Sequence, residues 1–523
     1  MGYMGWCNLR GGATSRSRMH ILIICFVKLL SLFCNWAWGS TIVVDTTADD
    51  RTSNGNCTLH EAMEAANTNT VVDSCTAGEP GLDTVDLSGI AGDIYLSTTL
   101  PFTEEDMTII GPGDENLLVH ANGIGGSIFR IKSLSAQVTV NISGIRITGG
   151  NITGNGGGIY VYPGNTLNLS SCRVDNNSAA LDGGGIINDQ GKLSITNCDL
   201  LYNTSAQRGG GLANFAGELT ITNSSIGNNT SANNGGGIFN LNGTVELSHS
   251  VLEANTAGYQ GGGIYSSGTD GETTLFESTI AGNNTINHGA GGIYNAFLSI
   301  MTLTRVTISQ NKTPDWYAGG GIWNDGTITI EESTISGNTS NNADGGILNQ
   351  GTAILKNSTI SSNIGVGFTN SAADTAEAEL TNCTIALNTE GGITNWKSLT
   401  LKNTVVANNT SYDCTFTDPI ISSGFNLDSD NTCGLTGPGD LPNTDPLLGP
   451  LDDNGGPTLT HALQTRSPAI DAGDNIVCPA TDQRGIKRPQ DGDRDGKALC
   501  DIGAYELSLS KATPWIPLLL LDD

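Results

Sequence analysis

The sequence predicts an all-β fold, a parallel β-solenoid of about ten or more coils whose N-terminal end is covered by a short helix. Three observations predict it. A phrase of about 25 to 28 residues recurs between residues 136 and 410, Asn returns in two fixed registers within it, and apolar and polar residues alternate in short runs between the Asn positions. Self-similarity at such a fixed period is typical of stacked repeat units.

The recurring phrase is clearest in LTITNSSIGNNTSANNGGGIFN (219–240) and ITIEESTISGNTSNNADGGILN (328–349). The first Asn column is Asn177, Asn203, Asn229, Asn255, Asn283, Asn311, Asn338, Asn363, Asn388 and Asn409. The second column is Asn188, Asn214, Asn240, Asn295, Asn324, Asn349, Asn370 and Asn395, with Ser266 in the gap. Asn tolerates the left-handed conformation of tight turns, and identical Asn side chains stacked coil on coil can bond to each other.

Alternation within each run has the period of short strands with one face inward, as in Leu219, Ile221, Ser224 and Ile226. We expect three short strands per coil and about 4.8 Å between coils. The Ile that ends each Gly-rich phrase should stack inside the solenoid, which gives the column Ile238, Ile264, Ile293, Ile322 and Ile347.

Composition excludes several protein classes. Gly accounts for 70 of the 523 residues, only 14% are charged, and 37% are hydrophobic, so the low-hydrophobicity, high-charge signature of disorder is missing. The 52 acidic residues against 23 Lys and Arg give a net charge of -29, which repels phosphate. We therefore expect no nucleic-acid partner.

Residues 1–39 are typical of a signal peptide. Arg16 and Arg18 precede an apolar stretch, 21–33, and small residues stand at the cleavage offsets in 37–39. We therefore expect the protein to be exported, either to the outside or to the cell surface. Two alternatives stay open: Met19 as the start residue, and a retained membrane anchor.

Export makes disulfides possible. Three sequence-local pairs lie outside the repeats and are the expected disulfides: Cys57 with Cys75, Cys414 with Cys433, and Cys478 with Cys500. Three further cysteines, Cys172, Cys198 and Cys383, occupy a small inward position of the coil, where buried thiols or a Cys172–Cys198 disulfide between adjacent coils would fit.

Residues 40–135 should form the N-terminal cap and the first coils. Thr58 and Glu61 make a capping box that opens a short helix, and this helix could cover the apolar side chains and unpaired strand edges of the first coil.

Both ends and the repeats resemble known bacterial families. The run CTLHEA (57–62) resembles the CSLREA domain, with Thr58 for Ser and His60 for Arg as departures. Residues 411–506 look like the choice-of-anchor Q domain, through TDPLLG (444–449), NGGPT (454–458), SPAIDAG (467–473), DQRG (482–485) and DIGAYE (501–506). The GGGIFN phrases (as in 235–240) are similar to the repeats of polymorphic outer-membrane proteins and, more loosely, to right-handed parallel β-helices of pectate-lyase type.

These resemblances imply a right-handed parallel β-helix at the surface of a bacterium, associated with the outer membrane. They do not imply a reaction, because the families are defined by architecture and anchoring. The chain ends with an apolar tail, 507–523, whose apolar run is too short to span a bilayer.

Two aromatic columns are the candidate carbohydrate-contact residues, because aromatic rings offer flat apolar faces with a polar tip. The first follows the inward Ile and comprises Phe239, Tyr265, Tyr294 and Trp323; the second precedes the Gly triad and includes Tyr259, His288 and Tyr317. We expect an exposed ladder with rings roughly 5 Å apart. The alternative is mutual packing that stiffens the rod.

The run DGDRDG (491–496) has the spacing of a calcium loop. Asp491, Asp493 and Asp495 would bind Ca²⁺, and Asp501 or Glu506 would have to replace the usual final Glu. An acidic turn held by the Cys478–Cys500 disulfide is the alternative.

Three functions fit the sequence. The first is a non-catalytic adhesion or carbohydrate-contact module whose partner is a polysaccharide or cell-surface glycan. The second is a polysaccharide lyase or hydrolase of pectate-lyase type, and the third is a structural spacer. A lyase would need a basic residue beside calcium-binding carboxylates, but the basic residues of the coils, such as Arg173 and Arg305, look single and out of column. We expect no catalytic residues.

Overall fold

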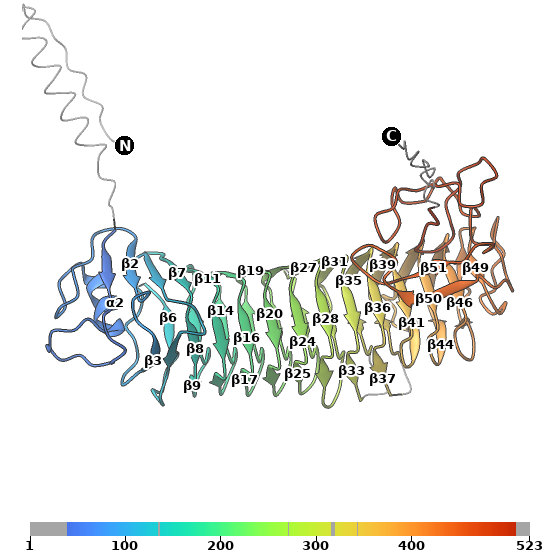
Figure 1. The fold of residues 1–523 in the computed structure, drawn as a ribbon. Helices are drawn as coiled ribbons and strands as arrows, with labels where there is room; N and C mark the ends of the chain where they lie inside the picture. Colours follow the sequence, from blue (N-terminus) through green and yellow to red (C-terminus); the bar gives the residue numbers. More distant parts are fainter. Residues whose placement is uncertain (1–38, 134–135, 270, 315–318, 342–343, 509–523) are drawn as a thin grey trace, which may run out of the picture.

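The computed structural model describes residues 39–133, 136–269, 271–314, 319–341 and 344–508. Most of the predicted leader, most of the apolar tail, and Tyr317 lie outside these residues. The described chain winds into a long rod of stacked coils, with the C-terminal segment packed on one side near the far end (Figure 1). All strand pairs of the rod are parallel, as the repeat predicts.

Each central coil contributes one strand to each of four sheets, numbered I to IV in chain order. One coil runs through β11 (Thr166–Ser170), β12 (Arg173–Asp175), β13 (Ser178–Ala179) and β14 (Ile186–Asp189). The sequence predicts three strands per coil. The fourth, the two-residue strand of sheet III, is too short for its alternation to be read from the sequence.

Sheet I has 15 strands. Besides β11 they are β1 (Thr41–Val43), β2 (Asp83–Asp86), β4 (Met107–Ile110), β7 (Thr139–Ser143), β15 (Lys192–Thr196), β19 (Glu218–Thr222), β23 (Thr244–Ser248), β27 (Glu272–Phe276), β31 (Ile300–Thr304), β35 (Thr327–Glu331), β39 (Thr352–Lys356), β42 (Glu377–Thr381), β45 (Ser398–Lys402) and β48 (Ile421–Ser422).

Sheet II has 14 strands and sheet III has 8. Sheet II comprises, besides β12, β3 (Gly92–Tyr95), β5 (Leu117–His120), β8 (Arg146–Thr148), β16 (Asp199–Leu201), β20 (Ser225–Gly227), β24 (Val251–Glu253), β28 (Thr279–Ala281), β32 (Thr307–Ser309), β36 (Thr334–Ser336), β40 (Thr359–Ser361), β43 (Thr384–Ala386), β46 (Val405–Ala407) and β49 (Leu427–Asp428). Sheet III comprises, besides β13, β9 (Asn151–Ile152), β17 (Thr204–Ser205), β21 (Thr230–Ser231), β25 (Thr256–Ala257), β29 (Asn284–Thr285), β33 (Lys312–Thr313) and β37 (Thr339–Ser340).

Sheet IV has 12 strands. Besides β14 they are β6 (Phe129–Ile131), β10 (Ile159–Val161), β18 (Leu212–Phe215), β22 (Ile238–Leu241), β26 (Ile264–Ser267), β30 (Ile293–Asn295), β34 (Ile322–Asn324), β38 (Ile347–Asn349), β41 (Val366–Asn370), β44 (Gly391–Asn395) and β47 (Cys414–Phe416). A separate antiparallel pair, β50 (Leu448–Asp452) and β51 (Thr460–Leu463), belongs to the C-terminal segment.

Both Asn columns are confirmed as buried ladders. In the first, the side-chain Nδ2 of each Asn donates to Oδ1 of the next Asn, over 2.9 to 3.1 Å. The second ladder bonds in the same way, with Ser266 accepting from Asn240. These bonds let the polar turns lie inside the rod. The exceptions are Asn188 Oδ1 and Asn295 Oδ1, which have no partner where the second ladder begins and where it resumes after Ser266.

The predicted isoleucine stack is also confirmed. Ile238, Ile264, Ile293, Ile322 and Ile347 lie opposite one another in register on sheet IV and are fully buried.

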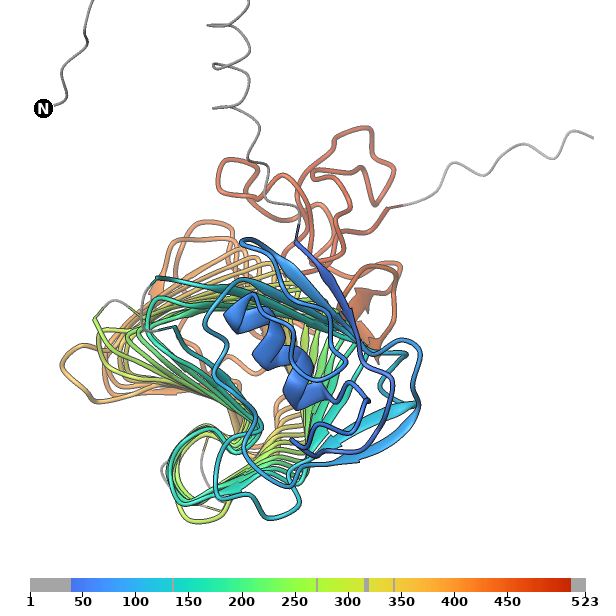
Figure 2. The same ribbon diagram turned by 90° about the vertical axis from the view of Figure 1, so that its left-hand side faces the viewer.

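The predicted N-terminal helix is α2 (Leu59–Thr68), and its capping box is present: the Thr58 side chain accepts from the Glu61 backbone N–H, and the Glu61 carboxylate accepts from the Thr58 N–H. Figure 2 shows α2 lying across the N-terminal end of the rod. Leu59, Met63 and Ala66 are buried there against the first coil. None of the described helices is long and apolar enough to cross a membrane.

The three predicted disulfides are confirmed: Cys57–Cys75, Cys414–Cys433 and Cys478–Cys500. Cys172, Cys198 and Cys383 are buried free thiols, which agrees with the first of the two alternatives for these residues. The Cys172 backbone N–H donates to Cys198 Sγ over 3.3 Å, in the place that a Ser hydroxyl takes in the next coils.

Candidate functional site

The first aromatic column exists, with the predicted spacing. Phe239, Tyr265, Tyr294 and Trp323 stand side by side on the outer face of sheet IV, and successive ring centroids lie 5.1, 5.3 and 5.4 Å apart. The first three rings are stacked face to face, and Trp323 meets Tyr294 edge-on.

The expected exposure of this column is wrong. Phe239 is 2%, Tyr294 7% and Trp323 8% exposed, and Tyr265 is only partly exposed. The chain between sheets III and IV folds back over the rings. At Gly235 it comes so close that a Cβ there would lie 2.8 Å from Phe239 Cα. The Arg208 guanidinium lies 4.9 Å from the Phe239 ring centroid, and the His288 and Trp323 ring centroids lie 5.2 Å apart.

The polar atoms of Tyr294 and Trp323 also form hydrogen bonds within the protein. Tyr294 Oη donates to Asp325 Oδ2 over 2.5 Å, and Trp323 Nε1 donates to Asp325 Oδ1 over 2.6 Å. Burial raises the pKa of Tyr294. This column therefore packs on itself, as the structural alternative expects. Of the second column, Tyr259 is exposed and His288 is partly buried.

The predicted calcium ligands are only partly brought together. Asp491 and Asp493 lie beside Asp471, with ligand oxygens within 4.8 Å of one another, and Asp491 Oδ1 is buried without a hydrogen-bond partner. Asp495 instead accepts from the Lys497 backbone N–H. Such a trio of hard oxygen donors could hold a cation.

Asp501 does not belong to this trio, and the structure corrects the sequence here. Its carboxylate is buried and accepts from the backbone N–H groups of Asp471 and Leu507. Burial, with Glu506 close by, raises the pKa of Asp501 to about 8. Its oxygens therefore hold the two ends of the loop together.

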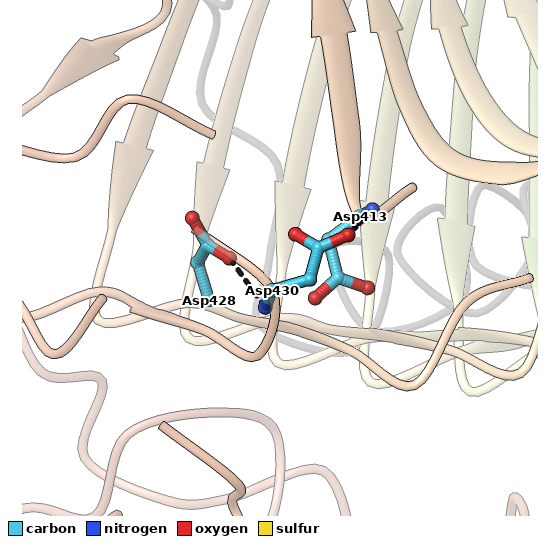
Figure 3. Close-up of side chains that lie close together, drawn as sticks. All are labelled: Asp413, Asp428 and Asp430. Carbon is cyan, nitrogen blue, oxygen red and sulfur yellow. Dashed lines mark hydrogen bonds between the residues drawn. The ribbon is translucent and has the colours of Figure 1, made fainter. Parts of the chain in front are cut away.

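A second acidic trio, Asp413, Asp428 and Asp430, closes the last coil beside the Cys414–Cys433 disulfide (Figure 3). The Asp430 N–H donates to Asp428 over 3.0 Å, and the Asp413 N–H donates to Asp430 over 2.9 Å. Burial raises the pKa of Asp413 and Asp428. Because backbone N–H groups already satisfy these carboxylates, the trio is explained as a turn that ends the rod.

The outer face of sheet II carries a charged cluster that the sequence analysis does not anticipate. Arg146 on β8 and Arg173 on β12 are register neighbours, and Asp199 on β16 continues their row. Arg146 donates to both oxygens of Asp175 over 2.9 and 2.7 Å, and Arg173 Nε donates to Oδ2 over 2.9 Å. The Asp175 side chain is 0% exposed, whereas both arginines are partly exposed.

Two aromatic rings extend this cluster toward the N-terminal end. Tyr95 on β3 is 53% exposed and lies opposite His120 on β5, with ring centroids 5.3 Å apart. The hydroxyl of Tyr95 donates to Asp93, which raises the pKa of Tyr95. Five successive strands of sheet II thus each present an aromatic or ionisable side chain outward: Tyr95, His120, Arg146, Arg173 and Asp199.

A usable signal for this cluster is present in the sequence. Arg173 and Asp175 are two residues apart on one strand, so they face the same way, and Arg146 stands one coil earlier at the same offset from the turn. Judging the basic residues one at a time hides this alignment. The same correction applies to Arg305, which bonds Glu277 and Glu332 of the adjacent coils.

One comparison with known proteins supports the fold. A family model described as "Right handed beta helix region" matches residues 242–416. No curated protein matches this chain. Among solved structures, the "Crystal structure of pectate lyase Pel9A" is 12% identical, with a TM-score of 0.32, over 90% of this chain and 96% of that chain. So distant a likeness carries no argument. The family model and the stacked parallel sheets show that the fold is a right-handed β-helix.

Proposed function

We propose that this protein is exported, stands at the cell surface and binds an uncharged glycan along the outer face of sheet II without cleaving it. One observation carries the proposal: the outward row Tyr95, His120, Arg146, Arg173 and Asp199 on five successive strands. The row steps by two residues along the strands between His120 and Arg146, because Arg146 pairs in register with Leu118. Strand spacing of about 4.8 Å is close to the length of one sugar unit, so an extended chain could follow the row.

The side chains of the row supply both contacts that a sugar needs. The exposed Tyr95 ring offers an apolar face for stacking. Asp175 fixes the two guanidinium groups in place, and their remaining N–H groups can donate to sugar hydroxyls. Groups held in position before binding lose less freedom on binding, which favours affinity.

Mixed charge favours an uncharged partner. Two arginines stand among Asp93, Asp175 and Asp199, so the face has no excess of cations to attract an acidic polymer. Binding without cleavage is favoured because the Asp175 carboxylate is buried beneath its arginine partners, which leaves it unavailable as a general base or as a cation ligand.

Export and surface attachment rest on other features. The basic and apolar pattern of residues 1–39 supports export, and the three disulfides suit an oxidising compartment. The resemblance of residues 411–506 to a choice-of-anchor domain supports attachment to the cell envelope.

The test is affinity electrophoresis of the purified protein in gels containing soluble neutral polysaccharides. We expect retardation in at least one gel, a reduction of about fivefold or more in affinity for Tyr95→Ala, and no change for the control Trp396→Ala, an exposed aromatic at the other end of the rod. Unsaturated, ultraviolet-absorbing sugar ends would favour the lyase alternative. If the protein migrates freely in every gel, it binds none of these glycans, and the structural-spacer alternative is favoured.

A further inference from the structure

A cavity of about 350 Å³ lies at the N-terminal end of the rod, between α2 and the segment that leads from β3 to β4. His60 and Glu64 of α2 line one wall, and Leu100 and Phe102 line the opposite wall. Arg130 of β6 closes the side. None of these residues belongs to the row on sheet II, so the cavity is separate from the proposed glycan face.

The walls of the cavity are fixed by hydrogen bonds between α2 and the opposite segment. Asn67 Nδ2 donates to the Phe102 carbonyl over 2.7 Å, and the Glu104 N–H donates to Asn67 Oδ1 over 2.8 Å. Arg130 Nη2 donates to the Leu100 carbonyl over 2.5 Å. The cavity is therefore formed before any ligand arrives, as most small-molecule sites are.

Two cations form no ion pair within the described part of the chain: Arg130, which lines the cavity together with the carboxylates Glu64 and Glu104, and Lys132, which contacts the Phe102 ring of its wall. Arg130 lies 4.2 Å and Lys132 5.0 Å from the Phe102 ring centroid, and neither forms an ion pair with any described residue. This is unusual in a chain of net charge -29, where most arginines of the coils bond a carboxylate. Arg51, at the mouth, is already paired with Glu64 over 3.2 Å.

Unsatisfied polar atoms are a second, independent indication. His60 is only 3% exposed, yet its Nδ1 has no hydrogen-bond partner, and Arg130 Nε is also buried without one. Leaving buried polar atoms unpaired costs about 1 to 3 kcal/mol each, so such atoms in a cavity wall point to a ligand that pairs them or their neighbours on the same side chain. Burial lowers the pKa of both groups.

We propose that this cavity binds a carboxylated sugar, a uronic acid residue, either free or at the end of a chain. The carboxylate would take the open side of the Arg130 guanidinium, which binds carboxylates with paired hydrogen bonds, and Lys132 would add its charge. His60 hydrogen-bonds a ring hydroxyl, and the Phe102 and Leu100 walls contact the apolar edge of the sugar. A cavity of this volume accommodates one sugar unit.

Isothermal titration of the purified protein with glucuronate and galacturonate, against glucose and galactose, tests the proposal. We expect uronate binding in the millimolar range, about tenfold or more tighter than the matched neutral sugar, and weakened by salt. Arg130→Gln should abolish it, and Lys132→Gln, at a partly exposed position, should weaken it about threefold or more. Lys312→Gln, an exposed cation far along the rod, is the control.

Oligosaccharides that end in a uronate separate the two sources: tighter binding than the free acid indicates a chain end, and equal binding indicates the free acid. Equal affinity for uronate and neutral sugar would overturn the proposal. So would unchanged uronate binding by the Lys132→Gln and Arg130→Gln variants, or no uronate binding by the natural protein. Retardation in neutral-glycan gels should be the same for Lys132→Gln, so failure here is distinguishable from failure of the sheet II face.

Discussion

Arg146 holds Asp175 by two parallel hydrogen bonds, Nε to Oδ1 over 2.9 Å and Nη2 to Oδ2 over 2.7 Å, across two adjacent coils of the rod. Paired bonds of this kind are both strong and directional. Because Arg173 bonds the same carboxylate, one buried aspartate sets the positions of two neighbouring cations on the proposed glycan face.

Asp175→Asn should lower the free energy of unfolding by about 2 to 3 kcal/mol, because it leaves two partly buried arginines without their anion. Denaturant unfolding measures the change. The matched control is Asp374→Asn, whose carboxylate is fully exposed beside Lys397 and should cost less than about 0.5 kcal/mol. If both variants lose the same small free energy of unfolding, the bonds between Asp175 and the two arginines do not stabilise the fold.

Trp323→Ala should destabilise the protein by about 3 to 5 kcal/mol, because it removes a buried ring and one of the two hydrogen-bond donors to Asp325. Glycan retention on sheet II should persist as long as the variant is folded. Trp396→Ala, at 46% exposure, is the stability control. If Trp323→Ala keeps the stability of the natural protein but no longer binds glycan, the glycan contact lies on the aromatic column and not on sheet II.

The sequence predicts the rod well because its signals repeat. An Asn, an Ile or a Gly phrase that returns in register from coil to coil must serve the same place in each of them, and the structure confirms both Asn ladders and the isoleucine stack. Helix α2 is likewise predicted from Thr58 and Glu61, because a capping box is a local device.

Exposure and clustering are less predictable. Alternation tells whether Phe239 points into the solenoid or out of it, but whether an outward ring is then covered depends on how the chain between two sheets folds back. The calcium loop shows the same difficulty: Asp471, which lies 20 residues before Asp491 in the sequence, is brought beside it by the fold. Only the register of the coils places Arg146 next to Arg173.

Asn255→Ala should lower the free energy of unfolding by about 2 to 4 kcal/mol. Asn255 Nδ2 donates to Asn283 Oδ1 and to the Ile226 carbonyl, and Asn255 Oδ1 accepts from Asn229, so truncation leaves buried groups unpaired in both adjacent coils. Asn233→Ala, on the preceding coil, removes only an exposed bond to Gln207 and should change the free energy of unfolding by less than about 0.5 kcal/mol. Similar values for the two variants would contradict a structural role for the ladder.

Millimolar calcium should raise the melting temperature, because a cation that binds only the folded C-terminal loop stabilises it by mass action. Asp471, Asp491 and Asp493 are the carboxylates that the fold brings together, so Asp471→Asn should abolish the shift. Asp495→Asn should keep it, because Asp495 serves a local turn. If the shift is lost in Asp495→Asn but kept in Asp471→Asn, the ligands are those that the sequence predicts, Asp491, Asp493 and Asp495. If calcium does not shift the melting temperature of the natural protein, the calcium hypothesis is wrong.

His461 should make the docking of the C-terminal segment sensitive to acid. Its ring joins β51 to the rod: Nδ1 lies 2.8 Å from the Gly449 carbonyl, which can only accept, so Nδ1 donates, and Nε2 then accepts from Ser361 Oγ over 2.8 Å. The ring is buried and neutral in this arrangement. The bond from Ser361 depends on the neutral form, because protonation removes the lone pair of Nε2, whereas Nδ1 donates to the Gly449 carbonyl in both forms.

Burial lowers the pKa of His461 below its ordinary value of 6.5, so the unfolded chain binds more protons than the folded chain just below that pH. The stability that His461 contributes is therefore present above pH 6.5 and is lost as the pH falls below it. Thermal unfolding and limited proteolysis of residues 444–508 should show a loss of protection over this window in the natural protein. His461→Gln, which cannot titrate, should show a shallower loss; identical pH profiles would mean that the segment is held independently of His461.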